Sequence, residues 1–169
     1  MYQIEEEIRD LLDGNVSTTY ETVTYSPKKY YVGNIRTEKL AHAYLPAIMV
    51  YGTEENMTAS GLTTARDRYE YLVRVKLVIG VLDHVASAGV ESDKILEAQR
   101  ILRLLMAEKD ANGVATSGSV LGILRRNIVG TNYLYHKDIQ ITYDEENIEG
   151  TMYYQAIMTL QAQKLRNRS

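Results

Sequence analysis

The sequence has no cysteine, no tryptophan and no phenylalanine, and it has only two prolines among 169 residues. Without cysteine, the chain has no disulfide, no thiolate metal ligand and no cysteine nucleophile. The three histidines, His42, His84 and His136, do not lie four residues apart, as a pair of metal ligands on one helix would. A serine nucleophile is equally unsupported, because the chain has no G-x-S-x-G elbow. These absences remove the usual routes to covalent or metal-assisted catalysis.

Two loops have the composition of a ligand-binding loop but lack its key residues. Gly113–Ser119 has the glycine spacing of a phosphate loop without the lysine that reaches the phosphates. In Asp144–Gly150 the glycine is one position late for a calcium loop, and no bidentate glutamate follows. Glu70 and Asp138 are not followed by the lysine of a carboxylate-dependent nuclease. We therefore expect no enzymatic activity, no metal and no cofactor.

Composition and charge indicate one globular domain that spans residues 1–169. Hydrophobic residues make up 45% of the chain and charged residues 24%, as in ordinary globular proteins. A net charge of −3 argues against a dedicated nucleic-acid binder, which normally has a basic excess. The N-terminus, Met1–Glu7, is acidic and no apolar run is long enough to span a bilayer. We therefore expect synthesis in the cytoplasm, with no signal peptide and no membrane contact.

Tyrosine is the abundant aromatic residue, with 14 copies. Its ring is apolar, its hydroxyl is polar and it has few torsions to order, so it suits half-buried positions and interfaces. Drift away from phenylalanine and tryptophan explains the same composition equally well. The tyrosines therefore fit an interaction protein without requiring one.

The first part of the chain predicts a short helix followed by strand and loop. Apolar residues at helical spacing indicate a helix over 2–13, which Gly14 can end in a left-handed conformation. Residues 19–32 alternate as a strand that Pro27 interrupts. For 33–44 we expect a loop with a turn of helix.

The next part predicts a long hairpin. Residues 46–51 are apolar on both faces, as a covered central strand would be. Residues 54–64 are interpreted as a polar connector. The alternation over 66–82 then predicts the longest strand of this half, with its odd positions facing the core.

One main helix is predicted between the two halves of the sheet. Ser92 can cap a helix that runs to about Lys109. Its buried stripe is formed by Ile95, Ala98, Leu102 and Leu105. Residues 110–113 form a turn, and 119–129 fit a buried strand or a short helix.

The last third, from Tyr133 to Leu165, predicts a second hairpin with strands at 135–143 and 151–162 and a turn at 145–150. The second strand alternates between an apolar and a polar, nearly uncharged face. The apolar face contains Met152, Tyr154, Ala156, Met158, Leu160 and Ala162. The polar face contains Thr151, Tyr153, Gln155, Thr159, Gln161 and Gln163, with Ile157 among them. Because such a face suits contact with another polar surface, we expect Tyr153, Gln155 and Gln161 to contact a partner.

Charged side chains alternate along 66–76. They are Arg66, Arg68, Glu70, Arg74 and Lys76. One interpretation is a solvated strand face with weak cross-strand ion pairs. The other is that these residues meet acidic residues of a neighbouring copy, which makes them interface candidates. The long hairpin around 54–74 and the polar face of 151–163 are the predicted contact regions.

The element order predicts an α+β fold. We expect a single domain with a mainly antiparallel sheet, an N-terminal helix and one main helix packed on the sheet. The sequence contains no internal repeat and no linker that would divide it.

This arrangement resembles the tail terminator (tail-completion) proteins of tailed bacteriophages. The matching segments are Ile4–Leu12, Leu45–Val50, Arg68–Val81, Asp93–Met106 and Tyr143–Leu160. The resemblance covers nearly the whole chain and lies in the order and patterning of the elements. The extra length relative to the smaller members falls in 19–44 and 110–130.

The resemblance implies a virion structural protein at the head–tail junction, assembled in the host cytoplasm. Its subunits would form a ring, typically a hexamer, that caps the tail tube and ends tail elongation. The implied partners are other copies of the chain, the tail-tube protein and the head–tail connector protein. DNA would only pass through the channel, which fits an acidic subunit that does not hold it.

Alternatives remain open at this point. A head-side adaptor or a tail-tube subunit would have a similar sequence pattern. A different class is a cytoplasmic protein-binding module, monomeric or dimeric, whose partner binds the terminal hairpin. A third alternative is a nucleic-acid-processing enzyme with an unrecognised site.

Overall fold

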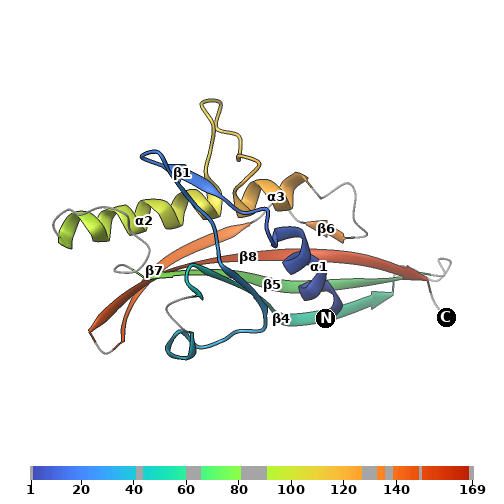
Figure 1. Ribbon diagram of the computed structural model, residues 1–169. Coiled ribbons are helices and arrows are strands. Elements are labelled where there is room, and N and C mark those ends of the chain that lie inside the picture. Colours follow the sequence, from blue (N-terminus) through green and yellow to red (C-terminus); the bar gives the residue numbers. More distant parts are fainter. Residues whose placement is uncertain are drawn as a thin grey trace.

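The computed structural model describes residues 2–40, 44–59, 66–80, 91–126, 133–135, 139–148 and 150–167. Within these ranges it has the α+β architecture that the sequence predicts: helices on one side of a mostly antiparallel sheet, in one compact domain (Figure 1). Side chains are described for 4–37, 39–40, 44–56, 69–80, 95–126, 139–148 and 150–162.

Three long strands form the centre of the main sheet: β4 (Ala47–Ala59), β5 (Arg66–Gly80) and β8 (Thr151–Asn167). β5 pairs antiparallel with β4 on one side and along its whole length with β8 on the other. The predicted hairpin of β4 and β5 is therefore confirmed. The alternation of apolar residues along β5 and β8 matches this central position, since both strands bury one face against the helices.

Shorter strands flank this centre. β3 (Lys29–Val32) pairs parallel with β4, the one departure from antiparallel pairing in the described main sheet. β7 (Gln140–Ile148) and β6 (Tyr133–Tyr135) both pair antiparallel with β8, at different positions along it. A small separate hairpin is formed by β1 (Thr18–Tyr20) and β2 (Val23–Tyr25).

The helices α1 (Tyr2–Leu12), α2 (Glu91–Ala107) and α3 (Val120–Arg126) lie over one face of the main sheet (Figure 1). In α1, Ile4, Ile8 and Leu12 recur every four residues and are buried, and Gly14 follows at φ +74°. In α2 the predicted stripe is confirmed: Ala98, Leu102 and Leu105 are buried, and Ile95 packs against the same core. We call this side of the sheet the helix-covered face.

The connection from α2 to α3 is ordered by short-range hydrogen bonds. The Asp110 side chain accepts hydrogen bonds from the backbone N–H groups of Asn112 and Val114, forming the predicted turn. The Ser119 hydroxyl accepts one from the N–H of Gly122 and thereby caps α3. A Cβ at Gly122 would lie 1.7 Å from the Thr116 carbonyl oxygen, so only glycine fits there.

Several element boundaries differ from the sequence predictions. The polar stretch after 53 is not all connector, because β4 continues to Ala59 after an irregularity between Gly52 and Glu54. Hydrogen bonding to β5 holds these polar residues in a strand that has little apolar pattern. β7 likewise extends to Ile148, which shortens the predicted turn.

In three further regions the structure defines or corrects the predicted secondary structure. The predicted strand over 19–32 divides into β1, β2 and β3, with a tight turn at Glu21 and Thr22, both at positive φ. For residues 119–129 the sequence fits either a strand or a helix, and in the structure residues 120–126 form the helix α3. The main helix begins at Glu91, so Ser92 lies in its first turn instead of preceding it.

Candidate interaction surface

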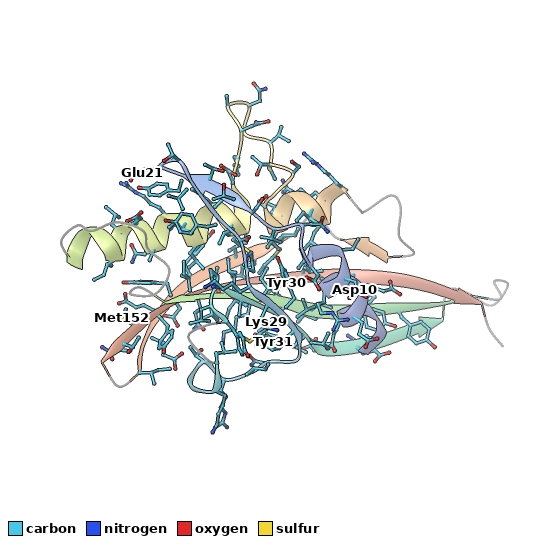
Figure 2. All side chains as sticks on the ribbon, viewed as in Figure 1. Asp10, Glu21, Lys29, Tyr30, Tyr31 and Met152 are labelled. Atoms are coloured by element: carbon cyan, nitrogen blue, oxygen red, sulfur yellow. The ribbon has the colours of Figure 1, made fainter. Side chains whose placement is uncertain are left out.

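The two faces of the main sheet are formed by alternating residues of the same strands. On β8, Tyr154, Ala156, Met158, Leu160 and Ala162 are buried in the core beneath the helices, as predicted. The residues between them point to the opposite side, which we call the far face. Adjacent tyrosines on β3 illustrate the division, because Tyr30 packs against the helix-side core and Tyr31 against the far-face cluster (Figure 2).

One half of the far face is covered by the segment between β3 and β4. This segment contains a short 3-10 helix, η1 (Thr37–Lys39), the turn of helix expected in 33–44. Leu40 and Leu45 from the segment form a second apolar cluster with Met49, Val78 and Tyr153 of the strands. The chain thus covers this half of the far face with its own residues.

The other half of the far face is open in the described structure. Strand register places Tyr51, Arg74 and Thr159 side by side in one row across β4, β5 and β8. Glu54, Leu72 and Gln161 form the next row, and Ile157 lies in the row on the other side of the first one. All seven side chains are half-buried or exposed, and Arg74 and Glu54 are the charged residues among them. We call this group the open patch.

The structure brings together some of the predicted interface residues and separates others. Arg74 and Gln161 are exposed members of the open patch, and Gln155 is half-buried on the same face. Tyr153 and Lys76 also lie on the far face but are only 6% and 9% exposed, so little of either side chain is available to a partner in the isolated subunit. Tyr153 is buried by the segment between β3 and β4, whose cover has no regular periodicity in the sequence.

The remaining candidates lie toward the other end of β5. Glu70 is half-buried and already interacts within the subunit. The backbones of Arg66 and Arg68 pair with Asn167 and Leu165 of β8. The side chains of these two arginines lie outside the described residues, as do His42, His84 and His136.

Lys76 lines a pocket of about 280 Å³ on the far face, with Asn34, Arg36, Thr37 and Glu146. Burial lowers the pKa of the Lys76 ammonium, and the Glu146 carboxylate partly opposes that shift. The sequence analysis missed the other four residues. Asn34, Arg36 and Thr37 lie in a segment without periodicity, and Glu146 was predicted only to lie in the turn of the terminal hairpin.

A second pocket, of about 310 Å³, lies on the helix-covered side between α2 and β7. Arg103 and Tyr143 both line this pocket, and the Arg103 guanidinium lies over the Tyr143 ring, 4.4 Å from the ring centre. Burial raises the pKa of Tyr143, and the nearby Arg103 charge partly offsets this rise. Gln99, Glu145 and Tyr154 also line the pocket, and the Tyr154 hydroxyl interacts with the side chains of Gln99 and Glu145.

The described residues contain no group of three or more histidine, aspartate or glutamate side chains that could hold a metal ion. Among those same residues, no helix combines the length and the apolar character needed to cross a membrane.

Comparison with protein-family models and with curated proteins found no match to this chain.

Proposed function

We propose that this chain is a ring-forming structural subunit of a bacteriophage tail, acting as the tail terminator at the head–tail junction. In this role the ring caps the tail tube, ends its elongation and joins the tail to the head connector. The observation that carries the proposal is the open patch, which lies on the long strands of the sheet on the side opposite the helices and combines hydrogen-bonding and apolar side chains with one positive and one negative residue.

The composition of the open patch supports contact with another protein. Charged groups are costly to remove from water, and the centres of protein interfaces are depleted of them. Tyr51, Thr159 and Gln161 instead offer hydrogen-bonding groups that a second polar surface can satisfy. Leu72 and Ile157 add apolar area between them. Arg74 and Glu54 carry opposite charges, so the patch as a whole is neutral.

The length of the strands supports a role beyond closing one small core. β5 has 15 residues and β8 has 17. At about 3.3 Å per residue, each is on the order of 50 Å long, against a usual strand of about 5–6 residues. At the end where β4 and β8 approach the C-terminus, the sheet extends past the helices (Figure 1). Such a projection gives neighbouring subunits a rigid surface to bind.

Ring closure is required by the proposed role. A heterologous contact between copies that did not close would polymerise, whereas a terminator must stop growth. The net charge of −3 is compatible with a channel through which DNA slides without being held. Polar contacts of this kind are expected to be weak in the free subunit and to strengthen when the tail tube positions the copies.

Electron microscopy of tails assembled with and without the protein tests the proposal. Without it we expect overlong or unjoined tails, and adding the purified protein to tails of normal length should allow joining. Tubes that fail to form at all would instead indicate a tail-tube subunit, and normal-length tails that cannot join would indicate a head-side adaptor. Normal-length, head-joined tails in its absence would contradict the whole class of function.

A further inference from the structure

The main sheet is bounded at one level by two different strands, β3 on one side and β7 on the other. Strand register follows a single row between them, from Lys29 through Ala47, Val78 and Gln155 to Asp144. Within the described part of the chain, β3 pairs only with β4 and β7 only with β8. Each of the two strands therefore has an outer edge whose backbone groups can pair with a further strand.

The directions of the strands allow one copy to continue the sheet of another. β3 is parallel to β4, and each step from β4 through β5 and β8 to β7 is antiparallel. β3 and β7 therefore run in opposite directions. When a second copy lies beside the first in the same orientation, its β3 meets β7 of the first as an antiparallel neighbour. The helices of both copies then lie on the same side of the sheet.

The outer edge of β3 is defined by its pairing with β4. The Gly33 N–H donates a hydrogen bond to the Val50 carbonyl oxygen. Backbone groups of successive residues in a strand point to opposite edges, so the odd residues of β3 face β4. The N–H and C=O groups of Tyr30 and Val32 therefore face outward.

The outer edge of β7 has a matching alternation. The Glu145 N–H donates to the carboxylate of Asp144 at 2.8 Å, so it faces away from β8, and Ile141 and Tyr143 follow the same alternation. Ile141 and Tyr30 both pack against the helix-side core. On both strands the outward-facing residues thus have their side chains on the helix-covered face, as continuous pairing between two copies requires.

Opposite charges follow the two edges. β7 contains three consecutive acidic residues and no basic one. They are Asp144, Glu145 and Glu146, and all three are exposed. Lys28 and Lys29 are exposed at the start of β3, which contains no acidic residue, and the Lys29 ammonium group lies over the Tyr44 ring. Two β7 edges therefore repel each other, as do two β3 edges, whereas a β3 edge attracts a β7 edge.

Charged groups of the same subunit also lie near these strands. Arg103 packs on β7 from the helix-covered face, and Lys76 attracts Glu146 from the far face. Asp13 acts on the Tyr30 hydroxyl of β3. Counted along the strands themselves, β7 carries three negative residues, while Lys28 and Lys29 give the β3 edge two positive ones. The difference in sign between the two edges remains.

We propose that copies of this chain associate edge to edge, with β3 of one copy adding antiparallel to the outer edge of β7 of the next. The shared alternation allows Lys29 to lie opposite Asp144 or Glu146. The contact is heterologous, because it joins two different edges, and such contacts build a ring when the rotation between copies closes. This inference rests on the proposed function for that closure, and it adds to the contact proposed at the open patch.

Charge reversal on each edge tests the pairing. Sedimentation velocity of the purified protein over a concentration series at low ionic strength measures self-association. Lys28→Glu/Lys29→Glu and Asp144→Lys/Glu146→Lys should each weaken it about tenfold, because each variant has two edges of the same sign. An equimolar mixture of the two variants should regain association, since every edge then finds an edge of opposite sign. That recovery also shows that both variants are folded.

Arg125→Glu/Arg126→Glu is the matched control, because it changes the net charge as Lys28→Glu/Lys29→Glu does, at exposed positions in α3. It should associate as the wild type does. A wild type that stays monomeric up to its solubility limit would overturn the proposal. The same holds for a mixture that associates no more strongly than either edge variant alone, or for a control that loses association equally.

Amide hydrogen exchange distinguishes strand addition from a loose ionic contact. The N–H groups of Tyr30, Val32 and Tyr143 should exchange more slowly at high than at low protein concentration, while that of Tyr31, which faces β4, should change little. Association without slower exchange at these three positions would contradict strand addition. These measurements use the purified protein alone, so their failure is separate from the result for assembled tails.

Discussion

The two faces of the main sheet use the same strands for different purposes. The helix-covered face buries Val73, Val75 and Leu77 of β5 beneath α1, α2 and α3. The far face is covered by the segment between β3 and β4 over one half and exposes the open patch over the other. Period-two alternation permits this division, because neighbouring residues on a strand point to opposite sides.

This difference shows that the face with the most buried residues explains the folding of the domain but does not by itself identify the surface that contacts a partner. Its core explains why the domain folds, since apolar area removed from water is the main stabilising contribution. The far face contains features that the core does not need: the exposed residues of the open patch and a pocket. The predictions below separate the two faces, from the largest expected effect on stability to the smallest.

Leu102→Ala should lower the free energy of unfolding by about 2–5 kcal/mol, as truncations of buried leucine do. Leu102 is 2% exposed and lies in the stripe of α2 that packs on the sheet. Gln161→Ala in the open patch is the matched comparison and should change stability by less than about 0.5 kcal/mol. Urea unfolding measures both. A cost below that level for Leu102→Ala would mean that α2 is not docked on the sheet.

Lys76→Met should raise the free energy of unfolding by less than about 1 kcal/mol, because burial of most of the side chain lowers the pKa of the ammonium group and an apolar chain of similar length removes that cost. Arg74→Met, on the same strand and face but exposed, should leave stability nearly unchanged. A loss of stability in Lys76→Met would show that the ammonium group is well satisfied within the subunit.

The dependence of stability on pH should also differ between the wild type and Lys76→Met. Burial lowers the pKa of folded Lys76 below the unfolded value of about 10.4, and Glu146 opposes this only in part. Between those two pKa values the unfolded chain binds more protons, so the free energy of unfolding rises with pH in this window. The Lys76→Met variant should lack that rise.

The quantity to measure at each pH is the difference in the free energy of unfolding between the wild type and Lys76→Met. Burial raises the pKa of Tyr30, Tyr143 and Tyr154, which makes stability fall above about pH 10 in both proteins. This contribution cancels in the difference. A difference that stays constant from neutral pH to about pH 10 would contradict the proposed environment of Lys76.

Arg74→Glu should have the smallest effect on the isolated subunit, below about 0.5 kcal/mol, because the side chain is exposed. Its effect on association should be large, since it places a negative charge within the proposed contact area. Arg126→Glu, at the end of α3 on the opposite side, produces the same change in net charge. Native mass spectrometry at high concentration should show fewer oligomers for Arg74→Glu alone. Equal behaviour of the two variants would argue against a contact at the open patch.

Much of the fold could be predicted from the sequence because local patterns agree with tertiary burial. The alternation along β5 and β8 and the stripe of α2 place their residues on the correct faces. The extension of β4 to Ala59 could not be predicted, because its polar residues are held by pairing with β5 and not by an apolar pattern. Strand pairing between distant segments has no local signal of its own.

The candidate surface was harder to predict than the fold. Alternation alone places Arg74 and Gln161 on the far face, where both are exposed, and their contact with a partner stays a prediction. Lys76 shares that alternation but is buried, because side chains of the segment between β3 and β4 cover its surroundings. The pocket is formed by residues that are distant in the sequence, and that packing has no periodic signature.

The central claim, that the open patch is a contact surface between assembled proteins, can be tested most directly by thiol labelling. The chain has no cysteine, so Gln161→Cys introduces a single reporter in the patch. Ser117→Cys, at an exposed position before α3, is the control on the helix side. In purified tails, the account predicts that the thiol of Gln161→Cys reacts at least tenfold more slowly than in the free subunit, while that of Ser117→Cys is less affected. Equal reaction rates for Gln161→Cys in free and assembled protein would contradict it.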